Sequence, residues 1–232
     1  EGGMIGIIGA MGVEIKRICA AMEDKKTVNI SGVEYHSGKL CGREIVTAAC
    51  GIGKVAAAVC AQTMILKFNP ELIINTGVAG TLSPELGVGD IAIAEFSVQH
   101  DMDTSPLGDP VGLISGINLI KIPCAERITR LLERSIEMLG GVKSKRGIIA
   151  SGDQFINSSE RKRFIVDTFG AIACDMECAS IAQVCYLNGV DFGAVRAISD
   201  SADGDSHVDY ARFLETAAVN ASEAVKHFLE LC

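Results

Sequence analysis

The sequence predicts a single α/β domain with a mixed, mostly parallel central β-sheet flanked by α-helices. Short apolar runs rich in Ile, Val and Ala alternate along the chain with segments of helical periodicity. Strands that alternate with helices favour parallel pairing, and buried parallel strands read as continuous apolar runs. The 232 residues include 25 Gly but no Trp, which is typical of tight turns around an aliphatic core. No linker divides the chain, so one domain is expected over residues 4–232.

The elements of the first third follow from local signals. An apolar run at 4–8 that ends in Gly9 predicts a buried strand, and helical spacing of apolar residues predicts a helix at 13–22. Gly-containing turn pairs then separate three expected hairpin strands, which make the sheet mixed. An Ala-rich helix follows and must end before Pro70. The hairpin strands are expected at 28–30, 33–40 and 43–49, and the helix at 51–68.

The rest of the chain continues the alternation of strand and helix. Between 97 and 123 little periodicity is visible and Gly and Pro recur, so an ordered functional loop is expected there. Residues 1–3, which precede Met4, are expected to be an expression remnant. Strands are expected at 72–75, 91–96, 147–150, 171–174 and 192–198, and helices at 125–139, 159–169, 177–188 and 210–231.

Charge and apolar patterning exclude several classes of protein. With 21 basic and 29 acidic residues the net charge is −8, which argues against a nucleic-acid partner and against an anionic membrane surface. No apolar run approaches the ~20 residues of a membrane span, and no secretory signal is visible. The nine cysteines are odd in number and lack C-x-x-C spacing. Free buried thiols and a cytoplasmic location are therefore expected.

No metal or cofactor is expected, because the four histidines are scattered without zinc-ligand spacing. The run His100-Asp101-Met102-Asp103 resembles a metal cluster superficially, and loop hydrogen bonding with interface contacts is the preferred interpretation. The glycine spacings match neither the dinucleotide fingerprint nor the P-loop. The turn Gly51-Ile52-Gly53 at a helix start is either a phosphate cradle or only a tight turn.

Acidic residues follow several of the expected strands. Glu14 follows the first strand, Asp175 and Glu177 follow the strand at 171–174, and Asp200 follows the last strand. Ligands of α/β sheets bind at the carboxyl ends of the strands, so these carboxylates are expected to converge. Each one alone could equally be a helix cap.

Seven motifs, in order, carry a resemblance to a known family. They are G-A-M-x-x-E at 9–14, G-I-G-K-V-A-A-A at 51–58, I-N-T-G-x-A-G at 74–80, V-G-D-I at 88–91, S-G-D-x-F-I-N at 151–157, D-M-E-x-A at 175–179 and V-R-A-I-S-D at 195–200. The chain resembles the bacterial 5'-methylthioadenosine/S-adenosylhomocysteine nucleosidases of the nucleoside phosphorylase family.

This resemblance implies hydrolysis of the N-glycosidic bond of methylthioadenosine, adenosylhomocysteine and 5'-deoxyadenosine in methionine salvage. Water is the co-substrate, and adenine and a 5'-substituted ribose are the products. Glu14 matches the base that activates water, and Asp200, assisted by Ser199, matches the acid that protonates adenine. Glu177 matches the group that binds the ribose hydroxyls. Further substrate-binding positions implied in the same way are Met11, Ile52, Val78, Ala79, Gly80, Phe155, Ile156, Asp175, Met176, Arg196 and Tyr210.

The chemistry requires these residue types independently of the resemblance. Adenine leaves poorly as an anion, so a proton donor lowers the barrier, typically by ~10²–10⁴-fold in rate. The sugar becomes oxocarbenium-like, and nearby carboxylates stabilise its positive charge.

Some positions depart from the family pattern. Phosphorolytic relatives bind phosphate with Arg and Ser where this chain has Asn75 and Val78, so hydrolysis is favoured. The family's 5'-substituent pocket borrows residues from a second subunit, which implies a homodimer and assigns Thr104, Leu107 and Asp109 to the partner's pocket. The alternatives are a purine nucleoside phosphorylase, another nucleoside hydrolase, or a non-catalytic nucleoside sensor.

Overall fold

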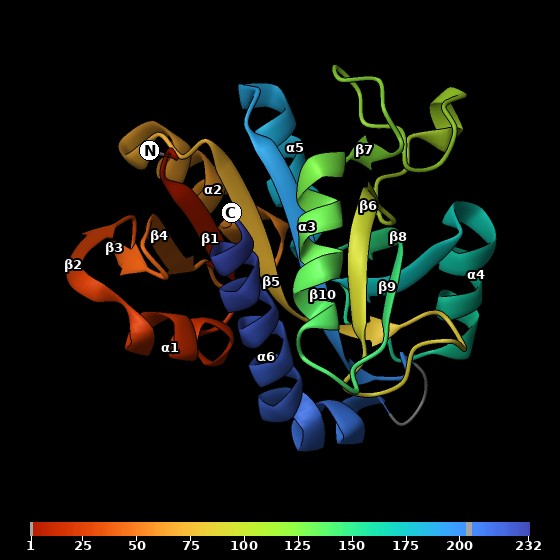
Figure 1. Ribbon diagram of the computed structural model, residues 1–232. Coiled ribbons are helices and arrows are strands. Elements are labelled where there is room, and N and C mark those ends of the chain that lie inside the picture. Colours follow the sequence, from red (N-terminus) through yellow and green to blue (C-terminus); the bar gives the residue numbers. More distant parts are fainter. Residues whose placement is uncertain (1, 203–205) are drawn as a thin grey trace.

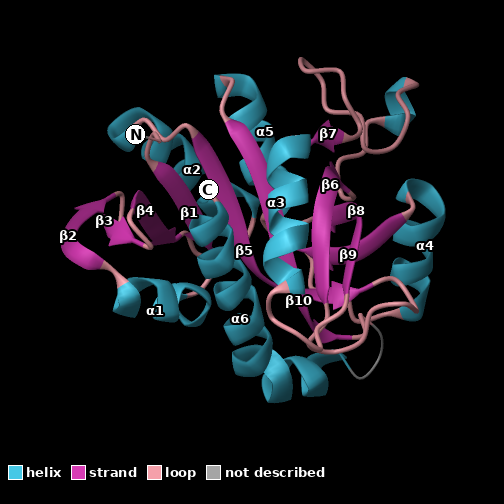
Figure 2. Ribbon diagram, viewed as in Figure 1, coloured by secondary structure: helices cyan, strands magenta, loops and turns pink. Residues whose placement is uncertain are grey.

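Helices cover both faces of a mixed β-sheet in the computed structural model of the chain, which describes residues 2–202 and 206–232 (Figures 1 and 2). The predicted fold class is confirmed. The strands are β1 (Ile5–Gly9), β2 (Glu23–Ile30), β3 (Val33–Leu40), β4 (Arg43–Ala49), β5 (Leu72–Thr81), β6 (Ile91–Gln99), β7 (Ile122–Pro123), β8 (Ser144–Ser151), β9 (Ala171–Asp175) and β10 (Asp191–Asp200). The helices are α1 (Gly12–Ala21), α2 (Lys54–Phe68), the 3₁₀ turn η1 (Ser105–Leu107), α3 (Glu126–Glu137), α4 (Ser159–Phe169), α5 (Cys178–Asn188) and α6 (Ser206–Leu231).

The strands pair in two parallel blocks. One block is β4, β1, β5 and β10, and the other is β6, β8 and β9. Antiparallel pairing of β5 with β9 and of β10 with β6 joins the blocks. The pairings therefore run from β5 through β10, β6, β8 and β9 back to β5, a closed ring that the sequence did not predict. The hairpin strands β3 and β2 extend the sheet beyond β4.

The helices form two layers. Helix α6 contacts both α1 and α3 on one side, and α2 packs on α5 on the other (Figure 1). Every residue of β1 and β5 is buried, which explains why their sequences are apolar without alternation. By contrast, β2 is polar and exposed over nearly its whole length, which is why its first five residues carried no strand signal.

Two strands are longer than predicted at the end where the motifs lie. The prediction ended β5 at residue 75 and β10 at residue 198, but they extend to Thr81 and Asp200. The backbone of the segment N-T-G-V-A-G is buried, so its polar groups need partners, and pairing with β10 and β9 supplies them. Helix α6 begins at Ser206, four residues before the predicted start.

Other predictions can be compared directly with the described residues. The stretch 97–123 is largely irregular, with the end of β6, η1, β7 and one bridge between Ile114 and Leu119. All nine cysteines are free, as predicted, but only five of them are buried, and Cys41 is exposed. Within residues 2–202 and 206–232, no helix combines the length and apolar character needed to cross a bilayer. Residue 1 of the expected expression remnant lies outside the described residues.

Candidate active site

A cavity of about 300 Å³ opens beyond the ends of β1, β5, β9 and β10. All four of the predicted carboxylates, those of Glu14, Asp175, Glu177 and Asp200, line it together. The remaining lining residues are mostly apolar, which suits a flat ring and a sugar with few charges. They are Ala10, Met11, Ile52, Val78, Ala79, Gly80, Phe155, Cys174, Met176, Ser199 and Tyr210.

Glu14 is held at the start of α1 by backbone donors. It is the third residue of the helix, and its Oε2 accepts hydrogen bonds from the N–H groups of Ala10 (2.6 Å) and Met11 (2.9 Å). This reach back to the helix start is the acidic half of a capping box. Its Oε1 accepts from Val78 N–H at 3.1 Å. Burial raises the pKa of Glu14, although Arg196 and the backbone donors oppose the shift.

Gly77 leaves the space that Glu14 and Arg196 occupy. A Cβ at this position would stand 2.5 Å from Glu14 Oε1 and 3.1 Å from Arg196 Nη1. Only glycine therefore leaves room beside β5 for both the carboxylate and the guanidinium.

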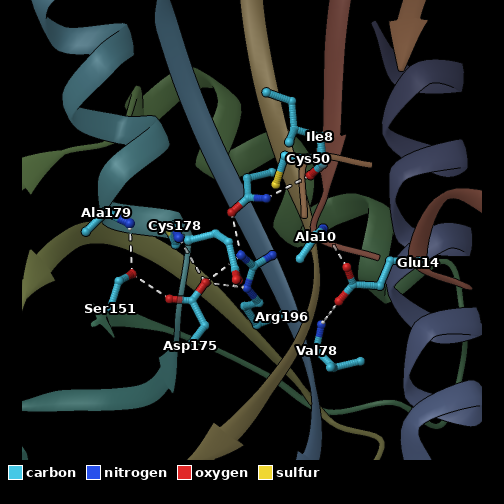
Figure 3. A network of polar contacts seen from close by, with 12 residues as sticks. Ile8, Ala10, Glu14, Cys50, Val78, Ser151, Asp175, Cys178, Ala179 and Arg196 are labelled. Carbon is cyan, nitrogen blue, oxygen red and sulfur yellow. Dashed lines mark hydrogen bonds and ion pairs between the residues drawn. The ribbon is translucent and has the colours of Figure 1, made fainter. Parts of the chain in front are cut away.

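A buried ion pair joins Asp175, in the cavity wall, to Arg196 (Figure 3). Arg196 donates from Nε (2.8 Å) and Nη2 (2.5 Å) to Oδ2 of Asp175, and from Nη2 to Oδ1 of Asn75 (2.5 Å). Asp175 also accepts from Ser151 Oγ (2.5 Å) and from Cys178 N–H (3.0 Å). The negative charges of Asp175, Glu14 and Glu177 outweigh burial and raise the pKa of Arg196, so the guanidinium stays protonated.

Glu177 connects the cavity to the start of α2. Its Oε1 accepts from Gly53 N–H at 2.8 Å, and the residue is buried. Burial and the neighbouring Asp175 carboxylate raise the pKa of Glu177 to about 7, although Arg196 and the Gly53 N–H oppose the shift.

The raised pKa of Glu177 predicts that the free energy of unfolding depends on pH. In the unfolded chain Glu177 releases its proton near its ordinary pKa of 4.5, but the folded protein keeps it up to about pH 7. The free energy of unfolding therefore falls as pH rises through that window. Glu177→Gln, which has no charge to bury, should gain up to about 3 kcal/mol relative to wild type between pH 4.5 and 8. Urea denaturation at both pH values measures this, and a difference that does not change with pH would contradict it.

Asp200 follows an irregularity in the strand. The register of β10 against β5 shifts between Ile198 and Asp200, so that Asp200 is paired with Gly80. Such bulges re-aim side chains next to functional sites. Asp200 is buried and faces the cavity, with Oδ2 accepting from Ser199 Oγ (2.9 Å) and Oδ1 from Ala202 N–H (2.9 Å).

One wall of the cavity is aromatic. The rings of Phe155 and Tyr210 meet edge to face with centroids 5.6 Å apart. Phe155 comes from the loop after β8 and is about half exposed, and Tyr210 comes from α6. The Tyr210 hydroxyl donates to Met11 Sδ at 3.4 Å. This wall offers a stacking surface for a base.

The remaining predicted positions divide into two groups. Ile156 lines a small recess of about 40 Å³ that shares Phe155, Met176 and Asp200 with the cavity, and Arg196 lies behind the wall rather than in it. Thr104, Leu107 and Asp109 do not line the cavity of this chain. Thr104 donates to Asp109 Oδ2 (2.8 Å), and Leu107 is 84% exposed.

Several cavity and network residues escaped the sequence analysis. Ala10 and Cys174 line the cavity, and Ser151 holds the ion pair, as does Asn75, which the sequence marked only as a departure from phosphate binding. Each lies inside a quoted motif or beside one, yet small or neutral side chains carry no chemical signal of their own.

The structure distinguishes between the interpretations of two segments, the turn Gly51-Ile52-Gly53 and the run from His100 to Asp103. Gly53 N–H and Lys54 N–H, the free donors at the start of α2, donate to Glu177 and Asp153, so the tight-turn interpretation holds rather than a phosphate cradle. In the run from His100 to Asp103, His100 Nδ1 bonds Arg161, Asp101 pairs with Lys54, and Asp103 accepts from Ser105 N–H. Loop hydrogen bonding is thus confirmed there. Within the described part of the chain, no cluster of three or more His, Cys, Asp or Glu side chains is arranged to hold a metal ion.

Comparison with known proteins agrees with this geometry. The model of the phosphorylase superfamily matches residues 4–230. A 5'-methylthioadenosine/S-adenosylhomocysteine nucleosidase from Shewanella halifaxensis is 37% identical over 214 residues, 92% of this chain and 93% of the relative.

Solved structures give the same result. The nucleosidase of Neisseria meningitidis, in complex with methylthio-immucillin-A, has a TM-score of 0.96 at 34% identity and covers 99% of each chain. A futalosine hydrolase of Helicobacter pylori has a TM-score of 0.95 at 36% identity, covering 99% of this chain and 98% of that one. The chain therefore belongs to the phosphorylase superfamily and, within it, to the 5'-methylthioadenosine/S-adenosylhomocysteine nucleosidase family.

Proposed function

We propose that the protein is an N-glycosyl hydrolase that cleaves methylthioadenosine, adenosylhomocysteine and 5'-deoxyadenosine to adenine and a 5'-substituted ribose. The observation that carries this proposal is the convergence of Glu14, Glu177 and Asp200 on one cavity with an aromatic wall. A sensor would need the apolar wall and the ribose contact, but would not need both an acid and a base. The free thiols fit a reducing cytoplasm.

The reaction needs a base for water and an acid for adenine. Glu14 accepts a proton from the attacking water, and its raised pKa brings it closer to neutral pH, where a base is most effective. Asp200 donates a proton to the departing adenine, and Ser199 orients its carboxyl group. Glu177 receives the ribose hydroxyls, and the carboxylates stabilise the positive charge that develops on the sugar.

Hydrolysis rather than phosphorolysis is favoured by the residues beside Glu14. Val78 offers an apolar side chain to the cavity, and the amide of Asn75 is already engaged by Ile8 O (2.7 Å) and Arg196. Neither side chain is available to bind phosphate.

Adenine release from a nucleoside panel tests the proposal. The purified protein should release adenine from methylthioadenosine in phosphate-free buffer, with no ribose 1-phosphate when phosphate is added. Strict dependence on phosphate would establish a phosphorylase instead, and tight binding without turnover would establish a sensor. Futalosine belongs in the panel, because one similar structure is a futalosine hydrolase.

We also propose a homodimer formed through α2 and its surroundings. Apolar side chains are exposed along α2 and on the adjacent α5, which is typical of a surface that a partner covers. A second copy would bring Leu107 of the partner subunit to the mouth of the cavity. Sedimentation velocity of the wild type should give twice the monomer mass, and the Val55→Asp variant should give the monomer mass. A monomeric wild type would refute the dimer. The exposed apolar residues are Ile52, Val55, Val59, Leu66, Tyr186 and Leu187.

A further inference from the structure

A second polar cluster lies beside the cavity without lining it. Asp101, which follows β6, accepts from Lys54 Nζ through Oδ1 (2.7 Å) and from Asp153 N–H through Oδ2 (2.9 Å). Asp153 in turn accepts from Lys54 N–H through Oδ1 (2.7 Å). We call these three residues the Lys54 cluster. It joins the start of α2, the start of the long loop and the loop that carries Phe155.

Gly53, the residue before Lys54, connects the cluster to Glu177 through the hydrogen bond of its N–H. Helix α2 begins at Lys54, and its cap residue Gly53 has a positive φ of 99° and no side chain to satisfy the helix donors. The donors of Gly53 and Lys54 go instead to Glu177 and Asp153. Free donors and the helix dipole make a helix start a favourable place for such carboxylates.

Two of the three side chains of the cluster are partly shielded from water, while Asp153 is exposed. The side chains of Lys54 and Asp101 are 21% and 16% exposed. Although burial raises the pKa of Asp101, the hydrogen bonds from Lys54 and from Asp153 N–H outweigh it and lower the pKa. Lys54 Nζ also donates to Gln99 Oε1 (3.2 Å), and Gln99 donates to Gln183 Oε1 on α5 (2.6 Å).

We propose that Lys54, Asp101 and Asp153 are positioning residues that hold Gly53 N–H against Glu177, and through it set the affinity for the ribose. The inference rests on the proposed function, in which Glu177 binds the ribose hydroxyls. Without the Lys54 ammonium, Asp101 loses its counter-charge, and the start of α2 is held only by Lys54 N–H on Asp153 and by Ser180 Oγ on Lys54 O (2.7 Å). Gly53 N–H is then held less firmly against Glu177, and the orientation of Glu177 toward the sugar is less well fixed.

Steady-state kinetics of Lys54→Met test the proposal. KM for methylthioadenosine should rise roughly tenfold, which corresponds to the free energy of one charge-assisted hydrogen bond. The kcat should stay within threefold of wild type. The dissociation constant of adenine, which has no ribose, should stay within twofold. Lys54→Arg, which keeps the charge, should recover most of the affinity. Lys39→Met, which removes an exposed pair with Glu44 outside the cluster, should leave KM unchanged.

Two results would overturn the inference. One is an active Lys54→Met variant with an unchanged KM. The other is adenine affinity that falls in parallel with KM, because that pattern means the whole pocket has collapsed. Asp101→Asn, which keeps the size of the side chain, decides the question by the same criteria if Lys54→Met does not fold. Absence of adenine release from the wild type would instead defeat the proposed function itself.

Discussion

Asp200→Asn is expected to lower kcat for adenine release from methylthioadenosine by about 10²–10⁴-fold. An amide cannot transfer a proton to the departing base, but it keeps the size of the side chain. Its one oxygen can still accept from Ala202 N–H, and its NH2 group can donate to the Ser199 hydroxyl. The change should therefore appear in kcat, with little effect on KM. Continuous detection of free adenine under saturating substrate measures it.

A matched control is available at the other end of the same strand. Asp191 begins β10, is exposed and pairs with Arg127 at 3.3 Å, so Asp191→Asn should retain wild-type kcat. Glu14→Gln should lose activity on the same scale as Asp200→Asn, because the attacking water then has no base. If either Asp200→Asn or Glu14→Gln kept full activity, the acid–base mechanism would be refuted.

Asp175→Asn is expected to lower the free energy of unfolding by about 3–5 kcal/mol. The variant leaves the Arg196 guanidinium buried without its counter-charge, and it weakens the contact with Ser151. Breaking one side of a buried pair costs far more than breaking an exposed pair, which contributes about 1 kcal/mol or less. Urea denaturation measures the loss, and Asp191→Asn again provides the exposed counterpart.

The ion pair can be tested further by removing both partners. Arg196→Met combined with Asp175→Asn removes both charges of the pair, so the double variant should be more stable than the sum of the single losses predicts. A loss below about 1 kcal/mol for Asp175→Asn alone would mean that water or another group compensates Arg196.

Strands and helices could be predicted from the sequence wherever the local pattern of apolar residues reflects their burial in the fold. The apolar runs of β1 and β5 are buried on every side, so their composition reported their burial directly. The carboxylates Glu14, Glu177 and Asp200 were found because acidic residues near the ends of buried strands are conspicuous, and the strand ends bring them together.

Features that depend on contacts distant in sequence escaped prediction. The closed ring needs β9 to pair antiparallel with β5 over only two residue pairs, Gly80 with Cys174 and Thr81 with Ala173. Asn75 holds Arg196 across 121 positions of the sequence, and an isolated amide gives no indication of such a partner. Lys54 was visible only as part of a motif, because its role depends on where Asp101 lies.

The closed ring has a consequence for how copies of the chain can meet. A ring has no free strand edge within it, so among the described residues the long open edge of the sheet is β2. That strand begins Glu23-Asp24-Lys25-Lys26, is exposed, and has a register irregularity against β3 between Glu23 and Lys26. Charges and irregular pairing at an edge prevent a strand of another molecule from adding to it. Neutralising these four residues would turn β2 into a template for intermolecular β-pairing, and the resulting hazard would be aggregation rather than loss of chemistry.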